Sequence, residues 1–166
     1  VNISAVQFHA GNLPETIATL IQQTGIAPGC LCLELTESIV MQDIEQTVAT
    51  LHRLRELGIK LSIDDFGTGY SSLNYLQRMP LTELKIDRSF IMNLPQDTNA
   101  IAIVDSVLTL SRSLNLTVVA EGVETPQQAA FLTARQCHQL QGYLFSRPLG
   151  AAAFEAFVDF SCKTVR

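Results

Sequence analysis

Two adjacent carboxylates, Asp64 and Asp65, stand between an apolar stretch and a glycine-rich turn in the sequence LSIDDFGTGYSSL, residues 61–73. Glycine-rich turns after strands commonly bind phosphate through backbone amides, and two carboxylates at the entrance would repel such a ligand. The two features are compatible if the aspartates bind cations and the cations hold the phosphate. Adjacent strand residues point to opposite faces, so the pair can share a site only where the strand ends. Gly67 and Gly69 permit the bend that this requires.

Polar side chains also follow the other apolar stretches of the sequence. They are Asn2, Glu34 with Glu37, Lys85 with Asp87, Glu121 with Glu124, and Gln141. The candidate metal ligands among the acidic and amide residues are Asn2, Glu34, Asp64, Asp65 and Glu121. This oxygen-only set suits Mg²⁺ or Mn²⁺ rather than zinc.

Two such ions roughly 3.5–4 Å apart could share a bridging carboxylate and hold a nucleophilic water in line with a phosphoryl group. Lys85 would bring one positive charge to that phosphate or water. A lowered pKa would allow Lys85 to act as a base.

Each of these features has an ordinary explanation when taken alone. An Asp-Asp pair before a turn is commonly a helix cap, Lys85 could be a surface charge, and Glu37 and Glu124 could cap helices. Neither His9, His52 nor His138 has metal-ligand spacing. The DFG string lacks the other protein-kinase motifs, and GTGYSS lacks the lysine of a phosphate-binding Walker loop. Repetition at the end of successive strands is what favours a single site.

The apolar patterns predict six strand–helix units. Strands are expected at 1–5, 30–36, 60–66, 81–90, 116–123 and 140–149, and helices at 13–25, 41–57, 70–79, 98–114, from 126 onward and 151–162. Such alternation is typical of a parallel sheet covered by helices, either doubly wound or closed into a (β/α)8 barrel. Polar residues at every strand end favour the barrel, because an open sheet feeds its ligand site from only two or three strands. We therefore expect an α/β fold of the TIM-barrel type with six of its eight units in this chain.

The composition limits the classes of partner. The 166 residues form one expected domain, residues 1–166, with a net charge of −5, which argues against a nucleic-acid polymer as ligand. The hydrophobic fraction of 47% comes without an apolar run of membrane-spanning length, which indicates strands buried on both faces. Four cysteines without a regular spacing indicate reduced thiols in a cytoplasmic domain. The chain begins at Val1, so it is expected to be part of a longer protein.

The sequence resembles the EAL domain family, the bacterial cyclic di-GMP phosphodiesterases. The matching stretches occur in family order and are VNIS, LELTES, DDFGTGYSSL, LKIDRSF, AEGVET and QGYLFSRPL. The resemblance implies metal-dependent hydrolysis of cyclic di-GMP to linear pGpG with two Mg²⁺ or Mn²⁺ ions.

The resemblance also implies roles for individual residues. Asn2, Glu34 and Asp64 correspond to ligands of one metal, Asp65 to a ligand of the second, and Glu121 to a further carboxylate near the metals and the water. Lys85 corresponds to the lysine that positions or activates the water, and Glu37 to the glutamate that anchors the loop after Asp65, through which a homodimer is expected. Glu124 and Gln141 correspond to substrate-binding positions, Glu124 at a guanine.

Two departures from the family pattern bear on activity. The Glu-Ala-Leu motif, whose glutamate is a metal ligand in the family, is absent, so the first two strands are expected to lie upstream. Gln136 and His138 stand where the family usually has glycine and aspartate, which we interpret as a minor loop change that could alter substrate contacts. The resulting hypotheses are an active phosphodiesterase whose residues 1–166 alone have little activity, and an inactive module that binds cyclic di-GMP or regulates. An upstream sensory or diguanylate cyclase domain and a membrane-anchored parent protein are further expectations.

Overall fold

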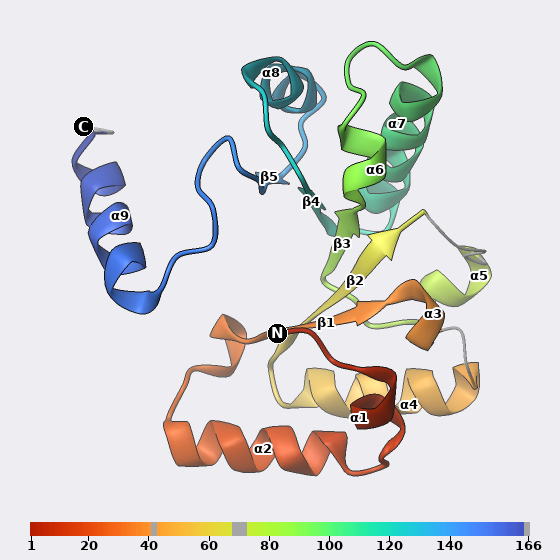
Figure 1. Ribbon diagram of the computed structural model, residues 1–166. Helices are drawn as coiled ribbons and strands as arrows, with labels where there is room; N and C mark the ends of the chain where they lie inside the picture. Colours follow the sequence, from red (N-terminus) through yellow and green to blue (C-terminus); the bar gives the residue numbers. More distant parts are fainter. Residues whose placement is uncertain (41–42, 68–72, 165–166) are drawn as a thin grey trace.

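A five-stranded parallel sheet organises the chain, with helices along its outer face (Figure 1). The computed structural model describes residues 1–40, 43–67 and 73–164. The strands are β1 (Cys32–Thr36), β2 (Lys60–Phe66), β3 (Glu83–Ile86), β4 (Thr117–Ala120) and β5 (Gln139–Leu140). The helices are α1 (Ala5–His9), α2 (Leu13–Thr24), the short 3-10 helix η1 (Pro28–Cys30), α3 (Glu37–Val40), α4 (Ile44–Glu56), α5 (Leu73–Leu76), α6 (Arg88–Ile91), α7 (Thr98–Ser113), α8 (Pro126–Ala134) and α9 (Ala151–Thr164).

The order of the strands in the sheet distinguishes the two α/β architectures. The order is β1-β2-β3-β4-β5, and every pairing is parallel. A doubly wound sheet reverses its strand order at a switch point, whereas a (β/α)8 barrel adds each strand beside the previous one. The sequential order confirms the expected barrel type, and all strand ends lie at one edge.

Local sequence signals explain the positions of the helix ends. Thr125 and Gln128 form a capping box at the start of α8, with Pro126 at its first position. Gly25 ends α2 in the left-handed conformation with φ 68°, and its amide donates to the carbonyl oxygen of Ile21 at 2.9 Å.

Every predicted strand except 60–66 is shorter in the structure than the sequence suggested, and the stretches at 1–5, 81–90 and 140–149 differ most. The stretch at 1–5 makes a single parallel bridge between Asn2 and Glu34, because Ser4 caps α1. The stretch at 81–90 ends as β3 at Ile86, because Asp87 caps α6. The stretch at 140–149 contributes only Leu140 to β5, because residues beyond 141 turn back toward Val123 and Gly142. The apolar pattern continued past each strand end into residues that pack without sheet pairing.

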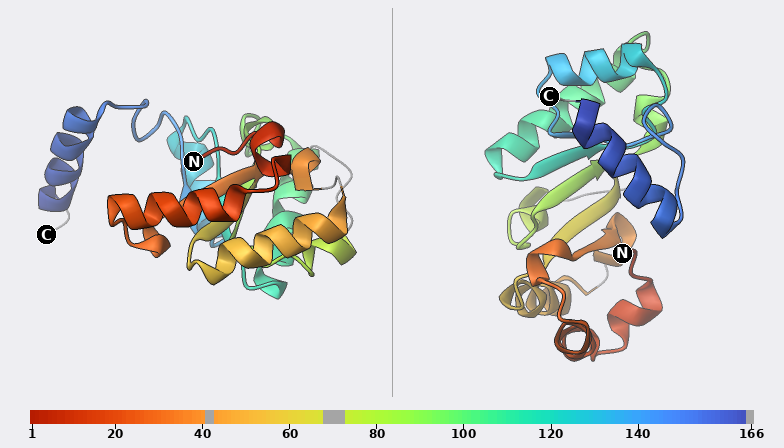
Figure 2. Two further views of the ribbon diagram at one scale, coloured as in Figure 1. Left: turned by 90° about the horizontal axis from the view of Figure 1, so that it is seen from below. Right: turned by 90° about the vertical axis from the view of Figure 1, so that its left-hand side faces the viewer.

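The core lies between the outer face of the sheet and the helices that cover it. Side chains there are fully buried and include Leu35, Leu51, Leu54, Ile63, Leu84, Ile86, Val104, Val118 and Leu132. Full burial of one such side chain contributes about 1.5–3 kcal/mol. By contrast, α9 stands apart from the sheet, and its residues 151–158 are exposed (Figures 1 and 2). In the described part of the chain, no helix combines the length and apolar character needed to cross a membrane.

Replacing Leu51 with alanine should lower the free energy of unfolding by about 2–5 kcal/mol, because the cavity forms in a fully buried part of the core. Urea denaturation monitored by circular dichroism measures the change. Val6 is 82% exposed, so Val6→Ala is the matched control and should change the stability by less than about 0.5 kcal/mol. Equal losses in the two variants would contradict the assignment of the core.

Candidate metal centre

The two aspartates lie on one side of β2 because the strand carries a bulge. Ile63 pairs with Leu84 and Phe66 with Ile86, so Asp64 and Asp65 together stand opposite the single residue Lys85. Asp65 has a left-handed backbone with φ 55°, a conformation that aspartate tolerates better than most residues. The bend was expected at Gly67 and Gly69. Gly67 has φ 97°, whereas Gly69 lies outside the described residues, and Asp65 itself makes the first part of the turn.

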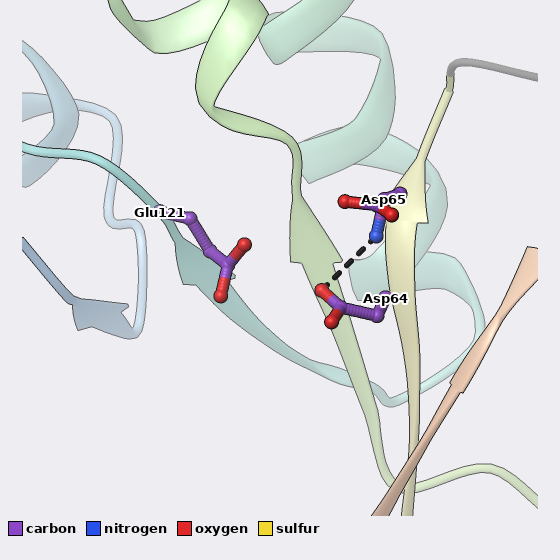
Figure 3. Close-up of side chains that lie close together, drawn as sticks. All are labelled: Asp64, Asp65 and Glu121. Carbon is purple, nitrogen blue, oxygen red and sulfur yellow. Dashed lines mark hydrogen bonds between the residues drawn. The ribbon is translucent and has the colours of Figure 1, made fainter. Parts of the chain in front are cut away.

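Asp64, Asp65 and Glu121 bring their carboxylate groups together at the mouth of the sheet (Figure 3). Each offers an oxygen that lies within 4.8 Å of the others, and the backbone amide of Asp65 donates to Oδ1 of Asp64 at 3.1 Å. Glu121 follows directly on β4, two strands away from β2. The predicted convergence of strand ends therefore holds for these three residues.

Lys85 connects this cluster to the first strand. Its ammonium group is 2.9 Å from Oε2 of Glu34, 3.3 Å from Oδ1 of Asp64 and 2.6 Å from Oε1 of Glu121. Burial alone would lower the pKa of Lys85, but hydrogen bonds to Glu121 and Glu34 and the charge of Asp64 outweigh it, so the pKa lies above its usual value. The expectation of a lowered pKa concerned Lys85 beside bound metal ions, and it stays a prediction.

Glu34 and Asn2 occupy the first-strand side of the site. Asn2 is bridged to Glu34, with the amide of Ile3 donating to the carbonyl of Glu34 at 2.9 Å. This pairing brings Asn2 to the same level of the sheet as Glu34, whose side chain faces Lys85. Of the five predicted metal ligands, three contact the ammonium group of Lys85, namely Glu34, Asp64 and Glu121. Asp65 lies with Asp64 and Glu121, and Asn2 pairs with Glu34.

Asp87 is a member of the site to which the sequence interpretation gave no role. It shares a side-chain hydrogen bond with Asp65, and burial together with the charges of Asp64 and Asp87 raises the pKa of Asp65. Burial opposes the ionisation of Asp87 too, but its hydrogen bonds with Ser89 outweigh this and lower its pKa. The available signal was its spacing, because Asp87 comes two residues after Lys85 at the end of the same strand.

Glu37 lies behind the metal centre rather than in it. Its side chain is 4% exposed, and its Oε2 accepts a hydrogen bond from the amide of Gly67 at 3.3 Å. The carboxylate therefore contacts the first residue after β2. Its role in anchoring the whole loop stays a prediction, because residues 68–72, through which a dimer was expected, lie outside the described residues.

Glu124 and Gln141 line a hollow of about 190 Å³ beside Glu121. Arg88 and Tyr143 also line it, and the Arg88 guanidinium lies 2.9 Å from Oε1 of Glu124. Arg88 was missed by the sequence interpretation, which gave the residue after Asp87 no role. The hollow thus combines a cation, a carboxylate, an amide and an aromatic ring, which are groups that recognise a polar planar ligand.

The walls of this hollow leave no free space for a side chain at Gly122 or Gly142. A Cβ atom on Gly122 would lie 2.3 Å from Cγ of Arg88, and a Cβ on Gly142 would lie 2.1 Å from the backbone oxygen of Val123. The first neighbour is a flexible side chain, whereas the second is backbone and cannot move aside without breaking the turn after β5.

The donor set fits hard divalent cations. Glu34, Asp64 and Glu121 contact the one ammonium of Lys85, and Asp65 lies with Asp64 and Glu121, so these four carboxylates carry a formal excess of negative charge when ionised. Burial and the charges of Asp64 and Asp87 raise the pKa of Asp65. Oxygen donors of this kind match Mg²⁺ or Mn²⁺, and none of the three histidines belongs to the described acidic cluster. His138, for example, accepts a hydrogen bond from the amide of Val118 at 3.1 Å.

Comparison with known proteins agrees with this geometry. The family model described as EAL domain matches residues 1–148. The chain is 51% identical over 158 residues to the cyclic di-GMP phosphodiesterase NbdA of Pseudomonas aeruginosa, covering 95% of this chain and 20% of NbdA. It is 47% identical over 158 residues to MucR of the same organism, named a bifunctional diguanylate cyclase/cyclic di-GMP phosphodiesterase, and covers 95% of this chain and 23% of MucR.

The chain is also similar to solved structures of proteins that bind cyclic di-GMP. The phosphodiesterase part of MucR in complex with cyclic di-GMP matches with a TM-score of 0.90 at 47% identity, over 93% of this chain and 62% of that one. BlrP1 of Klebsiella pneumoniae, in a complex with manganese and cyclic di-GMP, matches with a TM-score of 0.82 at 34% identity, over 89% of this chain and 38% of that one. The chain thus spans less than a quarter of the length of these curated relatives.

Replacing Gly142 with alanine should lower the free energy of unfolding by about 1–3 kcal/mol, because the new Cβ overlaps the backbone at Val123. Thermal unfolding of the two purified proteins measures this. Gly29 has no atom within 4 Å of a built Cβ, so Gly29→Ala should leave the midpoint nearly unchanged. A Gly142→Ala protein as stable as the Gly29→Ala protein would contradict the close approach.

Replacing Asp65 with asparagine should weaken Mn²⁺ binding at least about tenfold, because a charged oxygen donor is lost. Asparagine also tolerates the left-handed backbone of residue 65, so the bulge should persist. Isothermal titration calorimetry with Mn²⁺ measures the affinity. Asp105→Asn removes a half-exposed surface carboxylate and serves as the control. Unchanged Mn²⁺ affinity in Asp65→Asn would exclude Asp65 as a ligand.

Proposed function

The chain belongs to the EAL domain family, and on this premise we propose that the protein hydrolyses cyclic di-GMP to linear pGpG in a metal-dependent reaction. The observation that carries the proposal is the bulge of β2, which places Asp64 and Asp65 on one side, against Glu121. The complexes of MucR and BlrP1 with cyclic di-GMP support the substrate. Signalling through this second messenger in bacteria would be the biological setting.

Asn2, Glu34, Asp64, Asp65 and Glu121 would hold two Mg²⁺ or Mn²⁺ ions, as the donor chemistry allows. When bound, such ions lower the pKa of a coordinated water and offset the negative charge that develops on the phosphodiester. The choice of metal and the number of ions belong to this proposal. The manganese complex of BlrP1 supports a divalent ion.

Lys85 would orient the attacking water and stabilise charge as a permanently protonated group. Its ammonium contacts Glu34, Asp64 and Glu121, which are three of the ligands proposed for the ions. Hydrogen bonds to Glu121 and Glu34 and the ion pair with Asp64 fix the direction of its N–H groups before a ligand arrives, so little reorganisation is needed during the reaction. These ion pairs with carboxylates from three strands favour an electrostatic role for Lys85.

Glu124, Gln141 and Arg88 would bind the substrate next to the reacting phosphate. The hollow that they line adjoins Glu121, so a nucleotide base held there leaves its phosphate beside the carboxylates. The ion pair between Arg88 and Glu124 fixes the direction of the Glu124 carboxylate, which can accept hydrogen bonds from a guanine edge. Glu37 would support the site indirectly through Gly67.

A second candidate function is an inactive module that binds cyclic di-GMP or acts as a regulatory partner. It would be favoured if the strand expected upstream of Val1 lacks the glutamate of the Glu-Ala-Leu motif. The proposal also includes a sensory or cyclase domain in the same protein and a homodimer through the loop after Asp65. The bifunctional name of MucR supports the presence of a cyclase domain.

Replacing Lys85 with methionine should reduce kcat about 100-fold or more, because the hydrocarbon stem remains but the charge is lost. Production of pGpG by the full-length protein with Mn²⁺ or Mg²⁺, followed by chromatography, measures the rate. Lys60→Met is the matched control, since Lys60 is exposed at the start of β2. Binding of cyclic di-GMP without any pGpG from the intact wild type would favour the inactive module instead.

A further inference from the structure

Ser62 differs from its neighbours on the inner face of the sheet because it is fully buried. Residues two apart in a strand share a face, so Ser62 points to the same side as Asp64, and its pairing partner in β1 is Glu34. Ser62 is fully buried, whereas the other inward positions of β1 and β2 before the bulge are all at least partly exposed. These positions are Cys32, Glu34, Thr36, Lys60 and Asp64. Some group on the inner face must therefore cover Ser62 in particular.

The contact between Lys85 and Glu34 lies over this part of β2, beside Glu83, the residue of β3 that pairs with Ser62. Lys85 is on β3 and Glu34 on β1, with β2 between them, so their side chains must meet above β2. Neighbouring strands lie about 4.8 Å apart, so the pair spans about 10 Å of sheet. The register places Glu34 beside Ser62 and Lys85 opposite Asp64 and Asp65. The contact between Lys85 and Glu34 therefore crosses β2 between the levels of Ser62 and Asp64.

The hydroxyl group of Ser62 does not explain why a serine lies beneath the contact between Lys85 and Glu34. Its Oγ is buried and has no hydrogen-bond partner in the part of the chain that the structure describes. An unpaired buried polar group destabilises the folded state, so the hydroxyl is not a stabilising contact. The property of residue 62 that remains is its small volume.

We propose that Ser62 is a positioning residue whose small side chain lets Lys85 cross β2 and reach Glu34. A larger side chain at this position would lift Lys85 away from Glu34 while leaving its shorter contact with Glu121 available. The ammonium would then no longer join the first strand to the rest of the site. This inference rests on the function proposed above, but the geometry that it concerns can be measured without turnover.

The test compares Ser62→Ala, Ser62→Thr and Ser62→Val in the full-length protein. Alanine removes the hydroxyl and keeps the space, whereas threonine and valine have similar volumes and differ in the hydroxyl. We expect kcat for Ser62→Ala within about twofold of wild type, and a loss of about tenfold or more in both larger variants with little change in KM. Crystal structures should show the Lys85–Glu34 contact kept in Ser62→Ala and lengthened beyond hydrogen-bond distance in Ser62→Thr.

Ser111 offers a matched control because it is equally buried but lies in α7, where its hydroxyl donates to the carbonyl of Val107. Ser111→Val should lower the melting temperature without lowering kcat of the folded protein. Loss of activity in Ser62→Ala but not in Ser62→Thr would overturn the proposal, because the hydroxyl would then matter. An intact Lys85–Glu34 contact in Ser62→Thr would overturn it as well. If the wild type binds Mn²⁺ without turnover, the proposed function fails, while the crystal structures still decide the role of Ser62.

Discussion

The burial of one ammonium group among carboxylates is the constraint on which the site depends. Lys85 is 5% exposed and contacts carboxylates from β1, β2 and the end of β4. Removing a charge from water is costly unless its partners remain in place, so the positions of these acids are interdependent. The same carboxylates would repel one another without a cation. The site is therefore a charge cluster in which each residue limits where the others can lie.

The bulge of β2 is the second condition for this cluster. A regular strand would send Asp64 and Asp65 to opposite faces of the sheet, and only one could face Lys85. The left-handed backbone at Asp65 brings its carboxylate to the inner side, where it meets Asp87 as well as Asp64. Glu37 contacts the chain directly after the bulge, at Gly67. Backbone irregularity and acidic chemistry thus occur at the same residues.

Much of this arrangement could be predicted from periodicity and position. The parallel α/β fold followed from alternating patterns, and the convergence of Asp64, Asp65, Glu121 and Lys85 followed from their places at strand ends. The ends of the strands could not be found in this way, because apolar residues near Phe90 and Leu144 pack on the core without pairing in the sheet. Asp87 and Arg88 escaped assignment for a related reason. They follow β3 in a helical turn, whose direction depends on the cap at Asp87.

The sequential order of the strands has a consequence for how binding and folding are coupled. The cluster draws on residues from Glu34 to Glu121, so no single strand–helix unit contains it and it exists only when four strands are assembled. An ion that binds there selects the assembled sheet over every partly folded form. At a free concentration 100 times its dissociation constant, such an ion adds about 2.7 kcal/mol to the stability of the native state. Metal availability would then act on how long the protein persists as well as on its chemistry.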